Sequence, residues 1–282
     1  MRLIVLTLLA AAAVKAQPYA VRLARPERPG QSYSVSATGS KRYNAIIGDR
    51  AVKDVDYQVA FEGRVEILKI DAKQRPIRLA FTVEKFAKME GGVTIELLKP
   101  GSLVVVDGAE KQPISLKDGS IESTAREAFE LVYSAHKPES PTDDEIFGTK
   151  DEKNIGDSWP INHALAAENL KDTGISIPEG RLSGTVLLLN KDKIGATDCL
   201  SIQGEMNADG LSLTSQEIAP GFTLDSGSVH ARLWGCIPLD DSRLSRKEGV
   251  DLTMQMRLTS KEGVTLAVRT SQKRDAVWVS LK

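Results

Sequence analysis

The strongest constraint on this chain is a two-residue alternation of apolar and polar side chains. Between residues 55 and 67 the apolar positions are Val55, Tyr57, Val59, Phe61, Val65 and Ile67, and most positions between them are charged or polar. Successive side chains of a β-strand point to opposite faces, so the pattern predicts a long strand with one buried and one solvated face. The apolar phase changes at Leu68 and Ile70, which indicates a β-bulge or the end of the strand.

Alternating runs of this kind recur along most of the chain. The next apolar series, Ile77, Leu79, Phe81 and Val83, follows a polar turn and predicts a hairpin with the first strand. Further runs lie at 182–188, 200–206, 229–233, 250–258, 264–268 and 277–281. Only residues 121–135 and 160–170 have helical periodicity, and the first of these is clearly amphipathic. Residues 137–155 are rich in Pro and acidic side chains and are predicted to be a linker.

Two parts of the chain resemble each other at an offset of 121 residues. Residues 61–69 (FEGRVEILK) align with residues 182–190 (LSGTVLLLN), and Leu79 then falls on Leu200. With small shifts, residues 30–33 (GQSY) match residues 156–159 (GDSW). This order of matches predicts a mainly β fold of two duplicated antiparallel β-units. We expect curled sheets or half-barrels with one or two helices packed on them: a first unit at 17–136, the linker at 137–155 and a second unit at 156–282.

The first sixteen residues have the pattern of a secretory signal peptide. Arg2 precedes a short apolar run at 3–14, and small or tolerated residues predict cleavage between Ala16 and Gln17. The run is too short to span a bilayer, and we expect no membrane span after cleavage. The sequence therefore predicts a periplasmic or secreted protein. Its formal net charge of −1 and its lack of a basic stripe argue against nucleic acid as a partner.

Cys199 and Cys236 are the two cysteines of the chain. In an oxidising compartment we expect a disulfide between them, with two free thiols as the alternative. A metal site is disfavoured because no His lies near either Cys at ligand spacing.

The segment GDSW raises the question of a nucleophilic serine, because GDS(L) esterases carry their nucleophile in a similar block. Ser158 would need a base, and none of His136, His163 and His230 is preceded by Asp at the spacing of the esterase Asp-x-x-His block. We therefore interpret Gly30 and Gly156 as turn residues, and Tyr33 and Trp159 as the aromatic anchors that follow them. Trp234 and Trp278 are likewise expected to be core or strand-face anchors.

The remaining motifs favour structure over chemistry. Ser134 and Lys137 match the Ser-x-x-Lys pattern of penicillin-binding proteins, but the companion motifs are missing from the sequence. The acidic runs at 143–145 and 240–241 lack the spacing of a calcium loop and are expected to be solvated. We predict no catalytic residue, no metal ligand and no cofactor.

The order of these features resembles a family of uncharacterised exported bacterial proteins. In that family a β-rich first half beginning G-x-x-Y leads to an amphipathic helix, and a VGDSW-like turn opens a second β-rich half. The resemblance here rests on residues 30–33, the helix at 121–135 and residues 156–159. It implies no known activity and no catalytic residue.

The sequence thus predicts an exported, non-catalytic β-protein. We expect a binding, carrier or envelope-interaction module whose partner is a lipid, a peptide or an envelope protein, because one-face-apolar sheets can present an apolar surface. The alternative is a periplasmic hydrolase whose site is assembled from residues distant in sequence.

Overall fold

A single curved antiparallel sheet forms the body of the molecule. The computed structural model describes residues 17–281 except 172–173, 214–220 and 241, so the predicted signal peptide and most of its cleavage site lie outside the described residues. Within the described residues 12 strands form this sheet, and it is open at both edges. The mainly β prediction is confirmed, with 58% of the structure in strands and 9% in helices.

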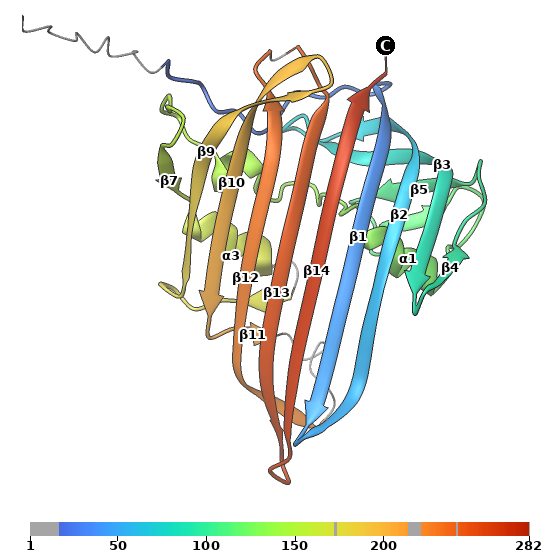
Figure 1. Ribbon diagram of the computed structural model, residues 1–282, viewed down its shortest axis with the longest axis vertical. Coiled ribbons are helices and arrows are strands. Elements are labelled where there is room, and N and C mark those ends of the chain that lie inside the picture. Colours follow the sequence, from blue (N-terminus) through green and yellow to red (C-terminus); the bar gives the residue numbers. More distant parts are fainter. Residues whose placement is uncertain (1–16, 172–173, 214–220, 241, 282) are drawn as a thin grey trace, which may run out of the picture.

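The strands join the sheet in an order that places the two chain halves side by side (Figure 1). From one edge to the other the order is β6, β5, β3, β2, β1, β14, β13, β12, β10, β9 and β7, with β4 paired to β3. The strands of the first half are β1 (Ser32–Ile47), β2 (Arg50–Ile70), β3 (Pro76–Glu90), β4 (Val93–Glu96), β5 (Leu103–Asp107) and β6 (Ile114–Leu116). Those of the second half are β7 (Ser158–Pro160), β9 (Leu182–Ile194), β10 (Thr197–Asp209), β12 (Phe222–Pro238), β13 (Arg246–Ser260) and β14 (Thr265–Ser280). A separate small sheet pairs β8 (Ile175–Ser176) with β11 (Ser212–Leu213).

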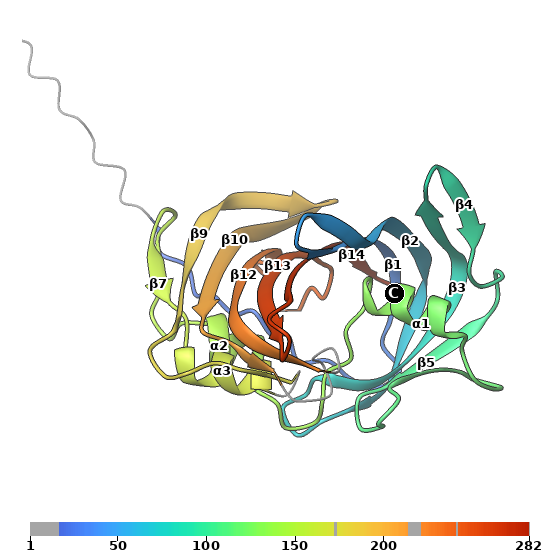
Figure 2. The same cartoon turned by 90° about the horizontal axis from the view of Figure 1, so that it is seen from below.

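Three helices lie on the concave side of the sheet (Figure 2). They are α1 (Ser123–Glu130), α2 (Asp143–Phe147) and α3 (His163–Lys171). Both predicted helices are present, and α1 is shorter than the predicted range of 121–135. Among the described residues, none of the helices is long and apolar enough to span a membrane.

The apolar side chains that alternate with polar ones in the sequence are the buried side chains of the strands. In β2 the side chains of Tyr57, Val59, Phe61, Val65 and Ile67 are buried and their neighbours are mostly exposed. The register of β2 against β3 shifts between Ile67 and Lys69, at the phase change seen in the sequence. The phase change is therefore an irregularity of the pairing, since β2 continues to Ile70.

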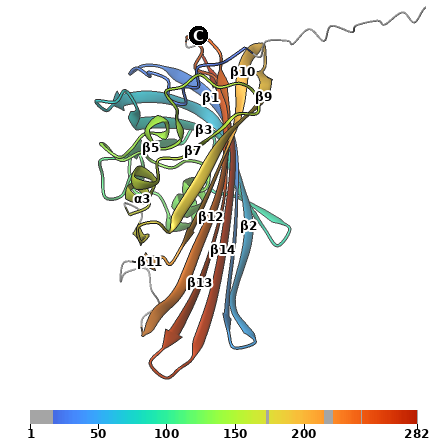
Figure 3. The ribbon, with the colours of Figure 1, turned by 90° about the vertical axis from the view of Figure 1, so that its left-hand side faces the viewer.

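Each half of the sheet covers its own hydrophobic cluster on the concave side. The first cluster joins β1, β2, β3 and α1 around Phe61, Phe81 and Phe129, whose rings lie edge to face with centroids 5.2–5.9 Å apart. The second joins β9, β10 and β12 with α2 and α3. The far ends of β1, β13 and β14 form a third, small cluster, where these long strands continue past the helices (Figure 3).

The segment predicted as a linker contains α2. Its residue Thr142 accepts a hydrogen bond from the Glu145 backbone N–H, and the Glu145 carboxylate accepts one from the Thr142 N–H. This reciprocal arrangement is a capping box, which satisfies two backbone donors that helix formation leaves unpaired. The acidic composition of the segment, interpreted as a sign of a linker, also supplies the first turn of a helix.

The two predicted turn segments make the same backbone contacts. Gly30 N–H donates to the Ile67 carbonyl and Gly156 N–H donates to the Leu188 carbonyl, each over 2.8 Å. Both glycines have a positive φ, 84° and 92°, which side chains with a Cβ adopt only with strain.

The aromatic residues after these turns also occupy matching positions in the sheet. Tyr33 on β1 lies opposite Val65 on β2, and Trp159 on β7 lies opposite Val186 on β9. Val65 and Val186 are the residues that the 121-residue offset aligns. The duplication itself stays a prediction, which these matched contacts support.

Candidate functional site

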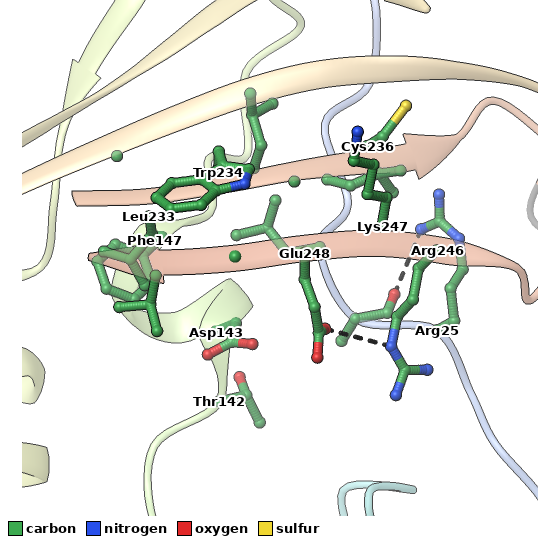
Figure 4. Close-up of a pocket in the computed structure, with 18 of the residues that line it drawn as sticks. Arg25, Thr142, Asp143, Phe147, Leu233, Trp234, Cys236, Arg246, Lys247 and Glu248 are labelled. Atoms are coloured by element: carbon green, nitrogen blue, oxygen red, sulfur yellow. Dashed lines mark hydrogen bonds and ion pairs between the residues drawn. The ribbon is translucent and has the colours of Figure 1, made fainter. Parts of the chain in front are cut away.

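The candidate site is a cavity of about 290 Å³ on the concave side of the sheet. Its floor consists of β9, β10, β12, β13 and β14, between the first and second hydrophobic clusters. Its walls are α2, the residues that follow α1, and the N-terminal segment, defined here as residues 17–31 (Figure 4). Ligand sites commonly have volumes of roughly 300–1,000 Å³, so this cavity suits a small ligand.

Two glycines on neighbouring strands create room in the floor. Gly204 on β10 lies opposite Leu233 on β12, and Gly235 on β12 lies opposite Ile202 on β10. Directly opposite residues of paired strands share a face, so each glycine replaces a side chain on the concave face. A Cβ at Gly204 would have its nearest neighbour 3.8 Å away, and one at Gly235 would have it 3.5 Å away. A Cβ at either position would therefore be in ordinary van der Waals contact, and a larger side chain at Gly204 would extend toward Leu233 and Phe147.

One end of the cavity is apolar. Val186, Ile202 and Leu233 form its floor, and Phe147 at the end of α2 covers it. Phe147 is held in place by Trp159, whose Nε1 donates to the Phe147 carbonyl over 2.8 Å. The predicted aromatic anchor of the second half therefore positions a wall of the cavity.

The other end of the cavity is charged. Arg246 on β13 donates to Glu27 over 2.7 Å and lies 3.3 Å from Glu248. The Arg246 guanidinium also lies 4.5 Å from the centroid of the Trp278 ring, and Trp278 Nε1 donates to Glu248 over 3.2 Å. Arg274 on β14 completes the group and donates to Ser134 Oγ over 3.1 Å. Glu27 is buried and Arg246 is half-buried, and buried charges are tolerated where they are paired and hydrogen-bonded, as in this pair.

These groups hold each other in the ionised form. Burial alone would raise the pKa of Glu248, but the Arg246 and Arg274 guanidiniums outweigh burial and lower it. Burial would lower the pKa of Arg246, but Glu248 and Glu27 outweigh burial and raise it. Burial raises the pKa of Tyr33 and of Tyr133, so both phenols keep their protons at neutral pH. Tyr33 uses its proton to donate to Glu27 over 3.1 Å.

The N-terminal segment crosses the cavity and contacts both halves of the molecule. Tyr19 exchanges two backbone hydrogen bonds with Lys153, and the N–H groups of Leu23 and Ala24 donate to the Asp144 carboxylate over 2.6 and 2.9 Å. Further along, the Glu27 N–H donates to the Gln74 carbonyl over 3.3 Å. The N-terminal segment therefore forms one wall of the cavity, although it is distant in sequence from the strands of the floor.

The predicted site residues are distributed around this cavity. Tyr33 is buried at its charged end, and Trp159 is buried behind its apolar end. Cys199 and Cys236 form a disulfide between β10 and β12, with their Cα atoms 5.6 Å apart, and Cys236 is among the residues that line the cavity. Trp278 borders the charged end, while Trp234 packs over Gly249 and donates to Asp275 over 3.1 Å.

Ser158 lies on β7 with an exposed side chain. Its neighbour Asp157 accepts a hydrogen bond from the Asn154 N–H over 2.7 Å, and in the other turn Gln31 accepts one from the Arg28 N–H over 2.7 Å. Asp157 therefore accepts a hydrogen bond that stabilises its turn. Gln31 makes the same contact in the other turn, so this role does not require a negative charge.

The acidic run at 143–145 belongs to a helix, and Ser134 lies at the cavity. Asp143, Asp144 and Glu145 form the first turn of α2, where Asp144 and Glu145 accept hydrogen bonds. Within the part of the chain that the structure describes, no group of three or more His, Cys, Asp or Glu side chains is arranged to hold a metal ion. Ser134 lines the cavity, as does His136, and His230 lies elsewhere, with Nδ1 2.8 Å from Asn207 Oδ1.

The sequence patterns do not predict four residues of the charged end, namely Glu27, Arg246, Glu248 and Arg274. The strand periodicity could have indicated two of them. Glu248 lies opposite the buried Ala276, and Arg274 lies two residues before Ala276 on the same face of β14. A charge in the apolar phase of a strand indicates a buried polar site. For Glu27, which lies outside any strand, no local pattern indicates burial.

Comparisons with known proteins do not assign this chain to a family. No family model matches it, and no curated protein matches it. A structure of lipovitellin, described for its lipid–protein interactions, is similar over 90% of this chain and 25% of that chain, with 9% identity and a TM-score of 0.35. The chain thus spans about a quarter of the length of that protein.

Two further solved structures are weakly similar. One is a loop-deletion mutant of OmpT, an outer membrane protein of Vibrio cholerae, with 7% identity, 88% of this chain and 99% of that chain covered, and a TM-score of 0.17. The other is OccK11 (OpdR) of Pseudomonas aeruginosa, with 9% identity, 92% and 100% covered, and a TM-score of 0.18. All three TM-scores are too low to assign a fold or a function.

Proposed function

We propose that this chain is an exported, non-catalytic binding protein that holds a small ligand with an apolar body in the concave-face cavity. The observation that carries the proposal is the apolar end of the cavity, where Gly204 adds no side chain to the lining formed by Leu233 and Phe147. Apolar pockets with a few convergent polar groups are typical of ligand sites.

Export is supported by the signal-like N-terminus of the sequence and by the disulfide between Cys199 and Cys236. Among the predicted partners, a lipid-like small molecule fits better than a peptide. Peptides are commonly bound along an exposed strand edge or in an open groove, whereas this cavity is covered by the N-terminal segment.

The hydrolase alternative is less well supported. Ser134 and His136 line the same cavity as Glu248. However, Ser134 Oγ accepts a hydrogen bond from Arg274, a cation that cannot act as a base. The binding proposal therefore predicts no hydrolysis of an ester such as p-nitrophenyl butyrate. A hydrolytic activity that Ser134→Ala abolishes in a folded protein would contradict it.

The binding proposal is tested by native mass spectrometry of protein purified from its own host, followed by calorimetric titration with decanol and decanoate. We expect a co-purified small molecule and measurable binding of at least one of the two decyl compounds. Gly204→Leu should weaken that binding by about tenfold or more, because its side chain fills the apolar end.

Ser183→Leu is the matched control, since it adds the same side chain at an exposed position of β9. It should leave binding unchanged. If neither decyl compound binds to the wild-type protein, or if Gly204→Leu binds both as well as the wild type, the proposed function is wrong.

A further inference from the structure

Arg274 is the cation of the charged end that the protein itself neutralises least. It lies on β14 opposite Gly39 of β1 and Val250 of β13, and it lines the cavity. Its Nη1 donates to the neutral hydroxyl of Ser134, while its Nε is buried without a hydrogen-bond partner among the described residues.

Arg246, by contrast, forms ion pairs with two carboxylates. It contacts the carboxylates of Glu27 and Glu248 and packs on the Trp278 ring. For Arg274, no carboxylate of the described residues lies within 4.0 Å of the guanidinium nitrogens. The two arginines therefore differ in what they can offer a ligand.

A guanidinium carries five N–H donors in a planar fork and no acceptor. Burial of such donors without acceptors is unfavourable, and carboxylate and phosphate oxygens match the fork in geometry and charge. The lining carries five Lys or Arg side chains, of which Arg75 is paired with Asp71 outside the lining. The other four face three carboxylates, so the charge of the lining also favours an anion.

We propose that the cavity selects an amphipathic anion, whose carboxylate or phosphate head binds Arg274 and whose apolar body lies against Leu233 and Phe147. This inference rests on the proposed function, and it adds the class of ligand and a residue that determines specificity. Head and body would occupy opposite ends of one cavity, with Gly204 and Gly235 in the floor that connects them.

The test compares decyl ligands that share one apolar body and differ in the head: decanoate, decyl phosphate, the neutral decanol and the cationic decyltrimethylammonium. Binding to the wild-type protein is measured by calorimetry at low and at physiological salt. We expect decanoate or decyl phosphate to bind about tenfold or more tightly than decanol, and the cation to bind most weakly. The tighter of the two anions identifies the head as a carboxylate or as a phosphate.

Arg274→Gln should remove the preference for the anion and leave the affinity for decanol within about twofold, because the apolar end is untouched. Arg269→Gln is the matched control, since Arg269 lies on the same strand with an exposed side chain. Arg274→Lys should retain part of the preference, because the charge remains and the fork is lost. Thermal unfolding establishes that each variant is folded.

The outcomes separate this inference from the proposed function. If decanol binds to the wild type as tightly as both anions, or if the cation binds most tightly, the anion proposal is overturned while the binding function stands. The same holds if Arg274→Gln keeps the full preference in a folded protein. If neither decanol nor decanoate binds, the proposed function fails, and the anion proposal that rests on it fails as well.

Discussion

At the scale of single residues, the two aromatic anchors differ in what they hold. Tyr33 donates to Glu27 and lies edge to face with Trp278, so it connects the first cluster to the charged end. Trp159 donates to the Phe147 carbonyl and so connects β7 to α2. Both were predicted as anchors from the turns that precede them. Their roles at the cavity depend on neighbours that are distant in the sequence.

Trp159→Ala should lower the free energy of unfolding by roughly 3–5 kcal/mol, because it removes a buried indole and leaves a cavity. Ser158→Ala is the adjacent control and should change it by less than about 0.5 kcal/mol, since its side chain is exposed. Both values are measured by urea unfolding. A Trp159→Ala protein as stable as the wild type would show that the indole does not anchor the second half.

At the scale of elements, α2 is a five-residue helix whose position depends on contacts at both ends. The capping box of Thr142 and Glu145 closes its first turn, and Lys73 from the loop before β3 adds an ion pair of 2.7 Å to Glu145. At the other end Trp159 holds Phe147 over the cavity. A helix this short is not stable by itself, so these contacts maintain that wall of the site.

Protonation of Glu145 should weaken this arrangement at acid pH. The Lys73 ammonium and the Thr142 N–H lower the pKa of Glu145 from 4.5 to about 2. A folded pKa below the unfolded one means that the stabilisation is fully present above about pH 4.5 and is lost as the pH falls through about 2. Glu145→Gln should therefore be less stable than the wild type at neutral pH, by less than about 1 kcal/mol because the pair is partly exposed.

Urea unfolding at neutral pH and near pH 2 measures this difference. It should shrink as the pH falls, because the wild-type side chain is itself becoming protonated. Thr142→Ala is the control, since its hydroxyl accepts a backbone hydrogen bond that does not titrate, and it should cost about 1 kcal/mol at both pH values. A Glu145→Gln deficit that is equal at both pH values would contradict the titration of this group.

At the scale of the whole molecule, the pairing of β1 with β14 joins the two chain halves into one sheet. This pairing places Glu27, which precedes β1, beside Arg246 of β13, and both line the cavity together with Arg274 of β14. The cavity is lined by residues of both clusters, among them Tyr133 of the first and Ile202 of the second. The disulfide between Cys199 and Cys236 fixes the neighbouring pair of β10 and β12.

Removal of this disulfide should destabilise the protein by roughly 3–4 kcal/mol, because the bond closes a loop with a sequence separation of 37 and restricts the unfolded chain. The measurement compares urea unfolding of the wild type with and without reducing agent. The double variant Cys199→Ser, Cys236→Ser should match the reduced wild type and should not respond to reductant. An unchanged unfolding midpoint after complete reduction would contradict this prediction.

The local features of this protein could be predicted from its sequence alone. Its two-residue alternation predicted the long strands and their buried faces, and the glycines at 30 and 156 predicted two turns. The cysteines predicted one disulfide. These features follow from backbone geometry and side-chain periodicity, which act between near neighbours in the chain.

The order of the strands, and the side chains that meet on the concave face, could not be predicted from the sequence. The sequence predicted two β-units, and the structure joins both in one sheet through β1 and β14. It also brings Arg246 and Arg274 of the last two strands into one cavity with Glu27 of the N-terminal segment. Strand order and register depend on contacts between residues far apart in the chain, so no local pattern could place these three side chains together.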